Sequence, residues 1–177
     1  MSASDLLLEI GCEELPSSFV ESAIQTLPDL ATKRFAALRL GHGAVRALGT
    51  PRRLALLVTG LAEQQPDLSE EVLGPPVKAA FKDGAPTRAA TSFAEKLGIP
   101  VGDLRRVDTP KGEYLAATRS ETGRPARELL PAALEEIVRA IPFRKSMRWA
   151  DLDFAFGRPI QWLVALFGDQ VVPLTIA

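Results

Sequence analysis

The sequence has only one cysteine and one histidine, Cys12 and His42. One cysteine excludes a disulfide within the chain, and the two residues together are too few for an ordinary zinc site, so we expect no metal. Long apolar runs are also missing: the longest, from Trp162 to Phe167, is far below the ~20 residues that span a bilayer. The N-terminus lacks the features of a signal peptide, so we expect a cytoplasmic protein without membrane contact.

An excess of charge of either sign is missing as well. The 177 residues include 21 basic and 22 acidic side chains, which gives a formal net charge of -1. No general basic field marks the chain as a nucleic-acid-binding protein, so any contact with RNA must be local. The sequence also has no phosphate-binding loop and no dinucleotide motif. We therefore expect neither an ATP site nor another cofactor in this chain.

Short apolar runs alternate with helical apolar periods. Runs typical of strands occupy residues 6–10, 44–48, 53–61, 104–108, 113–119, 160–167 and 171–176. Helical patterns cover residues 18–41, 77–81, 86–97 and 126–141; the first has capping-box spacing and contains Pro28, which should kink or divide it. The patterns predict an α+β fold in which mixed or antiparallel sheet hairpins pack with two long helices. We expect two small subdomains, residues 1–62 and 63–177.

Three carboxylates lie close in sequence to the single cysteine. Glu9, Glu13 and Glu14 near Cys12 suggest a base beside a nucleophile, or part of a metal site. A role without catalysis is favoured for Cys12, because neighbouring negative charges disfavour the thiolate and no second base is evident. Glu13 and Glu14 are then expected to cap the following helix or to form ion pairs. We predict no catalytic residue and no metal ligand.

Two adjacent arginines, Arg52 and Arg53, follow Pro51 at the start of an expected strand. Because side chains alternate along a strand, the two arginines should point to opposite faces. At most one can then serve a given phosphate, while the other pairs with an internal carboxylate. The pattern fits a structural role and an RNA contact equally well.

The strongest local signal for RNA lies in residues 137–150, which hold four basic residues and no acidic one. Trp149 offers a stacking surface there. The alternative is a solvated basic turn that Met147 and Trp149 anchor in the core. The same two interpretations apply to Arg158, which lies close to Trp162 in the sequence. The candidate RNA-contact residues are Arg52, Arg53, Arg144, Lys145, Arg148, Trp149 and Arg158.

Five short segments, in order, resemble the N-terminal region of the beta subunit of bacterial glycyl-tRNA synthetases. They are residues 8–16, 50–55, 74–76, 145–149 and 158–160, and together they extend over essentially the whole chain. The sequence departs from the family pattern at Cys12, Arg144 and Ala150, where threonine, proline and glycine are usual. The last departure bears on the geometry around Trp149, because alanine adopts a positive φ less readily than glycine.

The resemblance implies an enzyme of two alpha and two beta subunits (alpha2beta2) that charges tRNA(Gly) with glycine. In such an enzyme the alpha subunit uses ATP and magnesium to form the adenylate, so this chain alone is expected to be inactive. Its expected partners are the alpha subunit and tRNA(Gly). Two alternatives stay open: a pure protein-interaction module for assembly, and, less favoured, an editing-type hydrolase. Glycine is the smallest amino acid, so an editing pocket could not exclude it by size.

Overall fold

The computed structural model describes residues 2–82 and 84–176 and divides the chain into two compact units. Unit 1 is discontinuous: it contains the residues up to Pro66 and those from Gly123 onward. Unit 2, Asp67–Thr122, is inserted between these two parts. This division differs from the expected split at residues 62 and 63, because the C-terminal segment returns to the first sheet. The predicted α+β class is confirmed.

Unit 1 is built on a five-stranded antiparallel sheet with strand β1 (Ala3–Cys12) at its centre. Leu6 of β1 lies opposite Val58 on one side and opposite Phe167 on the other. The strand order is β12-β11-β1-β3-β2, with β2 (Val45–Thr50), β3 (Arg53–Ala62), β11 (Ile160–Phe167) and β12 (Gln170–Val171). The first predicted hairpin is confirmed as β2 and β3, whereas the last apolar run forms only the two-residue β12.

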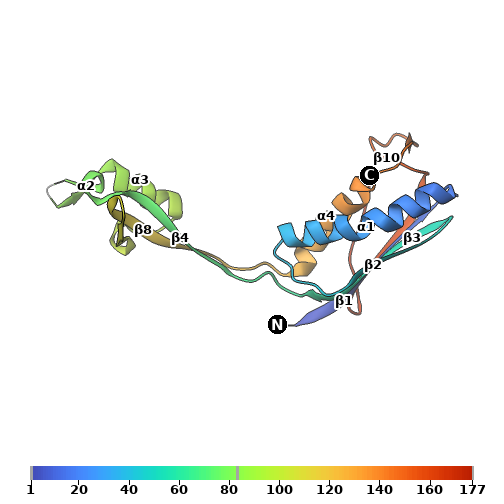
Figure 1. Cartoon of the computed structure of the whole chain (residues 1–177), viewed down its shortest axis with the longest axis horizontal. Coiled ribbons are helices and arrows are strands. Elements are labelled where there is room, and N and C mark those ends of the chain that lie inside the picture. The colour runs from blue at the N-terminus through green and yellow to red at the C-terminus, as the bar shows by residue number, and fades with distance from the viewer. Residues whose placement is uncertain (1, 83, 177) are drawn as a thin grey trace. The chain divides into compact units, whose positions relative to one another are not determined.

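Two helices, α1 (Ser17–Ala37) and α4 (Ala126–Ala140), pack against each other on one face of this sheet, the inner face (Figure 1). Their apolar stripes bring Leu27, Phe35 and Leu134 into the core, where each is fully buried. Burial contributes about 1.5–3 kcal/mol for each large apolar side chain. The inner-facing strand residues are Leu6, Leu8, Ile10, Leu54, Leu56, Val58, Ala165 and Phe167. Among the described residues, no helix is long and apolar enough to cross a membrane.

Pro28 lies inside α1, which continues past it to Ala37, so of the two expected effects the division does not occur. Leu27 and Ala31, on either side of the proline, are fully buried. Their packing on the sheet outweighs the hydrogen bond that proline cannot make. The expected capping box is also wrong: α1 begins at Ser17 directly after Pro16, which has no side chain that can cap a helix.

A small two-stranded sheet lies between α4 and β11, where β9 (Met147–Arg148) pairs with β10 (Ala155–Phe156). The ring of Phe143 packs edge-on against Phe156, with 4.7 Å between centroids, and also contacts Phe19 at 5.5 Å. These aromatic contacts fix the basic segment of the chain to the start of α1.

Unit 2 is a three-stranded antiparallel sheet with its own small core. Its order is β4-β8-β7, with β4 (Leu68–Pro76), β7 (Arg105–Thr109) and β8 (Gly112–Glu121). The rest of the unit is formed by α2 (Val77–Ala80), β5 (Phe81–Lys82), β6 (Ala85–Pro86), α3 (Arg88–Leu97) and a 3-10 turn (Val101–Asp103). Ala80, Ala90 and Leu115 are buried between the helices and the sheet. As predicted, α3 ends at Gly98, which has a φ of 68°.

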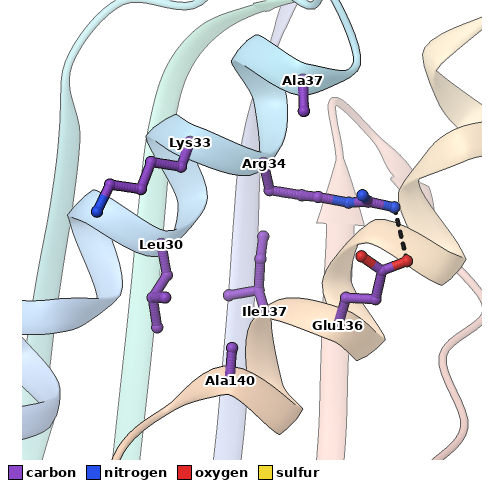
Figure 2. A pocket seen from close by; sticks show the side chains of 7 residues that line it. All are labelled: Leu30, Lys33, Arg34, Ala37, Glu136, Ile137 and Ala140. Atoms are coloured by element: carbon purple, nitrogen blue, oxygen red, sulfur yellow. Dashed lines mark hydrogen bonds and ion pairs between the residues drawn. The ribbon is translucent and has the colours of Figure 1, made fainter.

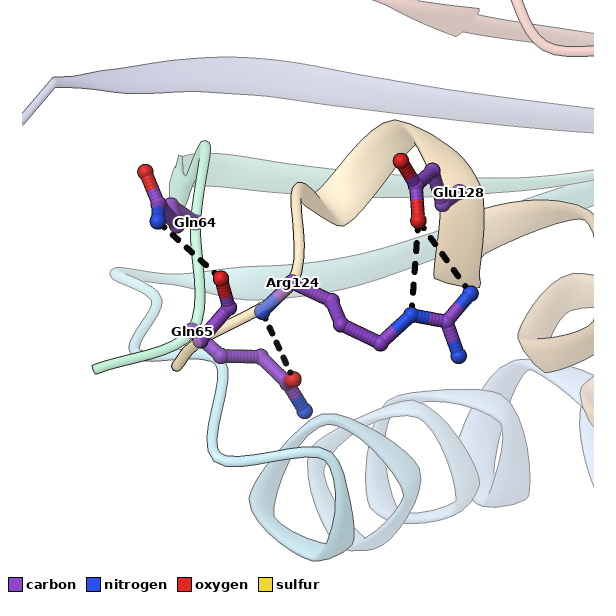
Figure 3. Close-up of polar contacts among 5 residues, drawn as sticks. Gln64, Gln65, Arg124 and Glu128 are labelled. Carbon is purple, nitrogen blue, oxygen red and sulfur yellow. Dashed lines mark hydrogen bonds and ion pairs between the residues drawn. The ribbon is translucent and has the colours of Figure 1, made fainter. Parts of the chain in front are cut away.

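The chain leaves and re-enters unit 1 through two segments that are hydrogen-bonded to each other (Figure 3). The backbone N of Gln65 donates to the carbonyl oxygen of Arg124 at 3.0 Å, and the amide of Gln64 donates to the carbonyl of Gly123 at 3.0 Å. The Gln65 side chain accepts from the backbone N of Arg124 at 3.1 Å and donates to the Leu38 carbonyl at 2.6 Å. A Cβ on Gly123 would lie 1.8 Å from the carbonyl oxygen of Gln65, so only glycine permits this approach.

Candidate subunit and RNA contact surfaces

Three of the segments that carry the family resemblance meet at one end of the unit 1 sheet. The backbone N of Cys12 donates to the carbonyl oxygen of Arg52 at 3.1 Å, and that of Leu15 donates to Pro51 at 2.7 Å. The backbone N of Glu13 donates to the carbonyl oxygen of Pro159 at 3.0 Å. The loop after β1 is therefore held between the β2–β3 turn and the start of β11.

The face of the sheet opposite α1 and α4, the outer face, exposes large apolar side chains. Leu48 is 52% exposed, Trp162 41% and Val171 74%. Five of the seven exposed large apolar residues among the described residues lie here. Because they share one face, they form a continuous surface and are not scattered single residues. The apolar residues of the outer face are Leu7, Leu48, Leu57, Trp162, Val164, Leu166 and Val171, and the charged residues Glu9, Arg46 and Arg53 lie on the same face.

Trp162 and Arg53 form a contact at one end of the outer face. The Arg53 Cζ lies 5.7 Å from the centroid of the Trp162 ring, and its Nη1 is 3.3 Å from Oε1 of Glu9. A Cβ on Gly11 would lie 2.0 Å from the Trp162 ring, so the glycine in the family-like segment makes room for the ring. Tryptophan and arginine are the residue types that most often dominate binding energy at protein interfaces.

The other predicted arginines of this region are also engaged. The Nη2 of Arg52 is 3.5 Å from Oε2 of Glu14, and both side chains are exposed. The Nη1 of Arg158 donates to the carbonyl oxygen of Gly157 at 3.1 Å. Arg53 lies on the outer face and Arg52 in the turn, and each has a carboxylate partner. Such exposed pairs contribute only about 0–1 kcal/mol to stability, but they neutralise the local charge.

In the basic segment between α4 and β11, residues 144–148, two of the charged side chains have no carboxylate partner among the described residues. Within the described part of the chain, neither Arg144 nor Lys145 makes an ion pair or a side-chain hydrogen bond, and both are exposed. The Nη1 of Arg148 is 3.2 Å from a carboxylate oxygen of Asp153. The Trp149 ring packs edge-on against a buried phenylalanine ring 5.6 Å away, so part of its surface is already covered. Arg144 and Lys145 therefore have charges that remain open to a phosphate.

Cys12 is buried at the end of β1 and is not activated. Its burial, reinforced by the negative charge of Glu13, raises the pKa of Cys12 to about 11. At neutral pH the group is a neutral thiol, and the thiol is a poor nucleophile and a poor metal ligand. The carboxylates of Glu9 and Glu14 pair with arginines, as described above. The arrangement gives no support to chemistry at this position.

An open hollow of about 280 Å³ lies between α1 and α4 (Figure 2). At its rim, Nη2 of Arg34 is 2.7 Å from Oε1 of Glu136 and links the two helices. The lining residues are Leu30, Lys33, Arg34, Ala37, Glu136, Ile137 and Ala140. None of these side chains is a nucleophile beside a general base, so the hollow has the chemistry of a packing surface.

Comparison with known proteins places the chain among subunits of aminoacyl-tRNA synthetases. Residues 6–177 match the family described as "Glycyl-tRNA synthetase beta subunit", and the chain belongs to that family. It is 52% identical, over 98% of its length, to the glycine–tRNA ligase beta subunit of Citrifermentans bemidjiense, and 53% identical over 97% to that of Myxococcus xanthus. The corresponding protein of Moorella thermoacetica is 46% identical over 99% of the chain. In each case the chain spans 25% of the relative's length.

Sequence reasoning proposed the hairpin around Trp162 as one possible subunit contact but did not show that exposed apolar residues of several strands share one face, although a signal for this was present. Strands exposed on one face alternate between apolar and polar residues, whereas strands covered on both faces are apolar throughout. Leu6, Leu7 and Leu8 form such an uninterrupted run in β1, and residues 162–167 form another in β11. The two neighbouring strands therefore have the composition of strands covered on both faces.

Proposed function

We propose that this chain is a non-catalytic region of a cytoplasmic glycine–tRNA ligase that supports ATP-dependent charging of tRNA(Gly) by subunit assembly. The outer face of the unit 1 sheet contacts the alpha subunit. That subunit binds ATP, magnesium and glycine, and this chain supplies no residue to the chemical step.

The observation that carries this proposal is the concentration of exposed apolar side chains on one sheet face. β1 and β11 carry large apolar side chains on both faces, with Leu7, Trp162 and Leu166 on the outer one, but α1 and α4 cover only the inner face. Removing the outer face from water is favourable at about 25 cal/mol per Å² of apolar surface. The surface therefore fits a protein partner.

Two of the charged residues of the outer face, Arg53 and Glu9, suit burial against a protein. Arg53 is already paired with Glu9 and lies over Trp162, so covering this cluster does not leave an isolated charge. An unpaired charge would make burial costly, whereas a paired and stacked one anchors an interface. The same pairing disfavours a phosphate at Arg53, because the phosphate would have to compete with Glu9.

The proposal is tested by placing a charge on the outer face of the full-length beta subunit and measuring its association with the alpha subunit. Leu48→Glu should weaken the association at least ~30-fold, because it would bury an unpaired carboxylate among apolar side chains. Met147→Glu is the matched control: Met147 is 43% exposed, close to the 52% of Leu48, but lies in β9, outside the outer face. Equal affinities of both variants and the unchanged protein would refute the assembly role.

Contact with the tRNA backbone is a second candidate function, favoured by the unpaired charges of Arg144 and Lys145. Phosphate contacts release counterions, so each contact that is lost lowers the salt dependence of binding by about one charge. The double variant Arg144→Gln and Lys145→Gln should therefore bind tRNA(Gly) and an unrelated tRNA more weakly to the same degree. A loss confined to one tRNA, or no change in the salt dependence, would contradict this role.

A further inference from the structure

Unit 2 has a candidate binding site of its own, on the face of its sheet that α2 and α3 do not cover. Val107 lies opposite Tyr114, and Leu73 lies opposite Ala116, so the register of β4, β8 and β7 places these side chains on one face. The opposite face carries Leu115, which is buried against α2 and α3. Leu73 is 55% exposed, and a hollow of about 320 Å³ opens beside it. The lining residues are Leu73, Gly74, Thr109, Pro110, Lys111 and Tyr114.

The family-like segment Gly74–Pro76 shapes this hollow. The segment belongs to unit 2, so the proposed subunit contact on unit 1 does not explain its sequence. The pairing of β4 with β8 shifts between Leu73 and Pro76, so a bulge lies beside Tyr114. Bulges of this kind redirect side chains and are over-represented near functional sites. On the other side, a Cβ on Gly74 would lie 2.5 Å from the ring of Phe93 in α3. Glycine at this position therefore lets the helix pack closely behind the floor of the hollow.

The hollow combines an aromatic ring, aliphatic surface and unneutralised positive charge. Tyr114 is the only tyrosine of the chain, and its hydroxyl makes no hydrogen bond within the described residues. In the same described part of the chain, the exposed ammonium of Lys111 makes no ion pair. Arg105, on the same face, donates to the hydroxyl of Thr118 at 2.5 Å and not to a carboxylate. A planar group can therefore stack on Tyr114 while an anion reaches Lys111.

We propose that this hollow binds one unpaired nucleotide of an RNA, with the base stacked on Tyr114 and its phosphate next to Lys111. A base has a flat apolar face and a charged phosphate beside it, which matches the ring and the cation at this site. A volume of about 320 Å³ lies at the small end of the range for ligand sites and suits a single nucleotide. The inference relies on the proposed function for its source of RNA, which is the tRNA.

The experiment measures binding of the 177-residue chain to tRNA(Gly) and to a single-stranded RNA hexamer by fluorescence anisotropy over a salt series. Tyr114→Ala should weaken hexamer binding by roughly 5- to 100-fold, the range for loss of one stacked base, and Tyr114→Phe should stay within about 3-fold of the unchanged chain. Lys111→Gln should reduce the slope of log affinity against log salt by about 0.7. The matched control is Lys78→Gln, which removes an exposed lysine from α2 on the other side of the sheet.

Either of two results would overturn the proposal. The first is a Tyr114→Ala variant that keeps its circular dichroism spectrum and binds both RNAs as tightly as the unchanged chain. The second is a Lys111→Gln variant that keeps its RNA affinity but, in the full-length beta subunit, no longer associates with the alpha subunit. That result would make this face a protein contact. Failure of the assembly role is distinguishable, because Leu48→Glu tests it on unit 1 in a separate measurement.

Discussion

Gln65 is the residue whose replacement tests most directly how unit 1 holds the insertion. Its side chain is 8% exposed and bridges three parts of the chain: β3 ends just before it, Leu38 follows α1, and Arg124 precedes α4. Replacement by leucine keeps most of the volume but removes both side-chain hydrogen bonds. The carbonyl of Leu38 and the backbone N–H of Arg124 then lose these partners in a partly buried setting.

Each buried backbone group left without a partner costs about 1–3 kcal/mol. Two such groups give a range of about 2–6 kcal/mol, and because both are only partly buried, Gln65→Leu should lower the free energy of unfolding of unit 1 by about 2–4 kcal/mol. Urea unfolding followed by tryptophan fluorescence measures this loss selectively, because Trp149 and Trp162 both belong to unit 1. Circular dichroism reports both units and checks that the variant folds.

The control is Gln64→Leu. Gln64 is exposed, is adjacent to Gln65, and within the described residues donates only one side-chain hydrogen bond, to the carbonyl of Gly123. We expect it to cost less than about 1 kcal/mol, since a net hydrogen bond contributes roughly that amount. If Gln65→Leu proved no more destabilising than Gln64→Leu, the buried amide would not be holding the two connecting segments together.

Three further predictions concern single residues of unit 1. The Cys12 thiol of the folded chain should react with a disulfide reagent at least ~100-fold more slowly than that of the unfolded chain, because its pKa is raised from 9.0 to about 11; equal rates would contradict its burial. Ala150 has a φ of 50°, so Ala150→Gly should raise the free energy of unfolding by about 0.5–1 kcal/mol, and a lower melting temperature would refute the strain. Gly11→Ala should cost about 1–3 kcal/mol in urea by displacing Trp162, and adding Trp162→Ala should restore part of that loss.

Local patterns predicted the helices and the hairpins of neighbouring strands, but not how strands far apart in the sequence pair. The helix at residues 126–141 is confirmed as α4, because its apolar stripe has one period throughout and meets the core along its whole length. No local pattern shows that β11 lies beside β1, since that pairing joins segments about 150 residues apart in the sequence. The predicted split at residues 62 and 63 assumed that segments adjacent in the sequence pack together, whereas unit 1 combines segments from both ends of the chain.

For the predicted RNA-contact residues, the sequence likewise does not show which side chains already have a partner within the fold. The motif around Arg52 and Arg53 was recognised, but the sequence cannot show that Glu9 and Glu14, far from them along the chain, neutralise both. It also cannot show that Trp149 packs on a phenylalanine while Trp162 remains open. Charge and aromatic content indicate which residues can contact RNA or protein, and only the tertiary structure indicates which of them are still unpaired.

The central place of β1 has a consequence for the order in which this chain folds during synthesis. β1 is made before β3 and soon pairs with it, but the other edge of β1 stays open until residues 160–167 have been made. Unit 2 is contiguous and can fold during this interval. An open strand edge next to exposed leucines invites pairing with other chains. The newly made chain is therefore most vulnerable to aggregation before β11 closes the sheet, and substitutions that delay this pairing would lower its yield more than its final stability.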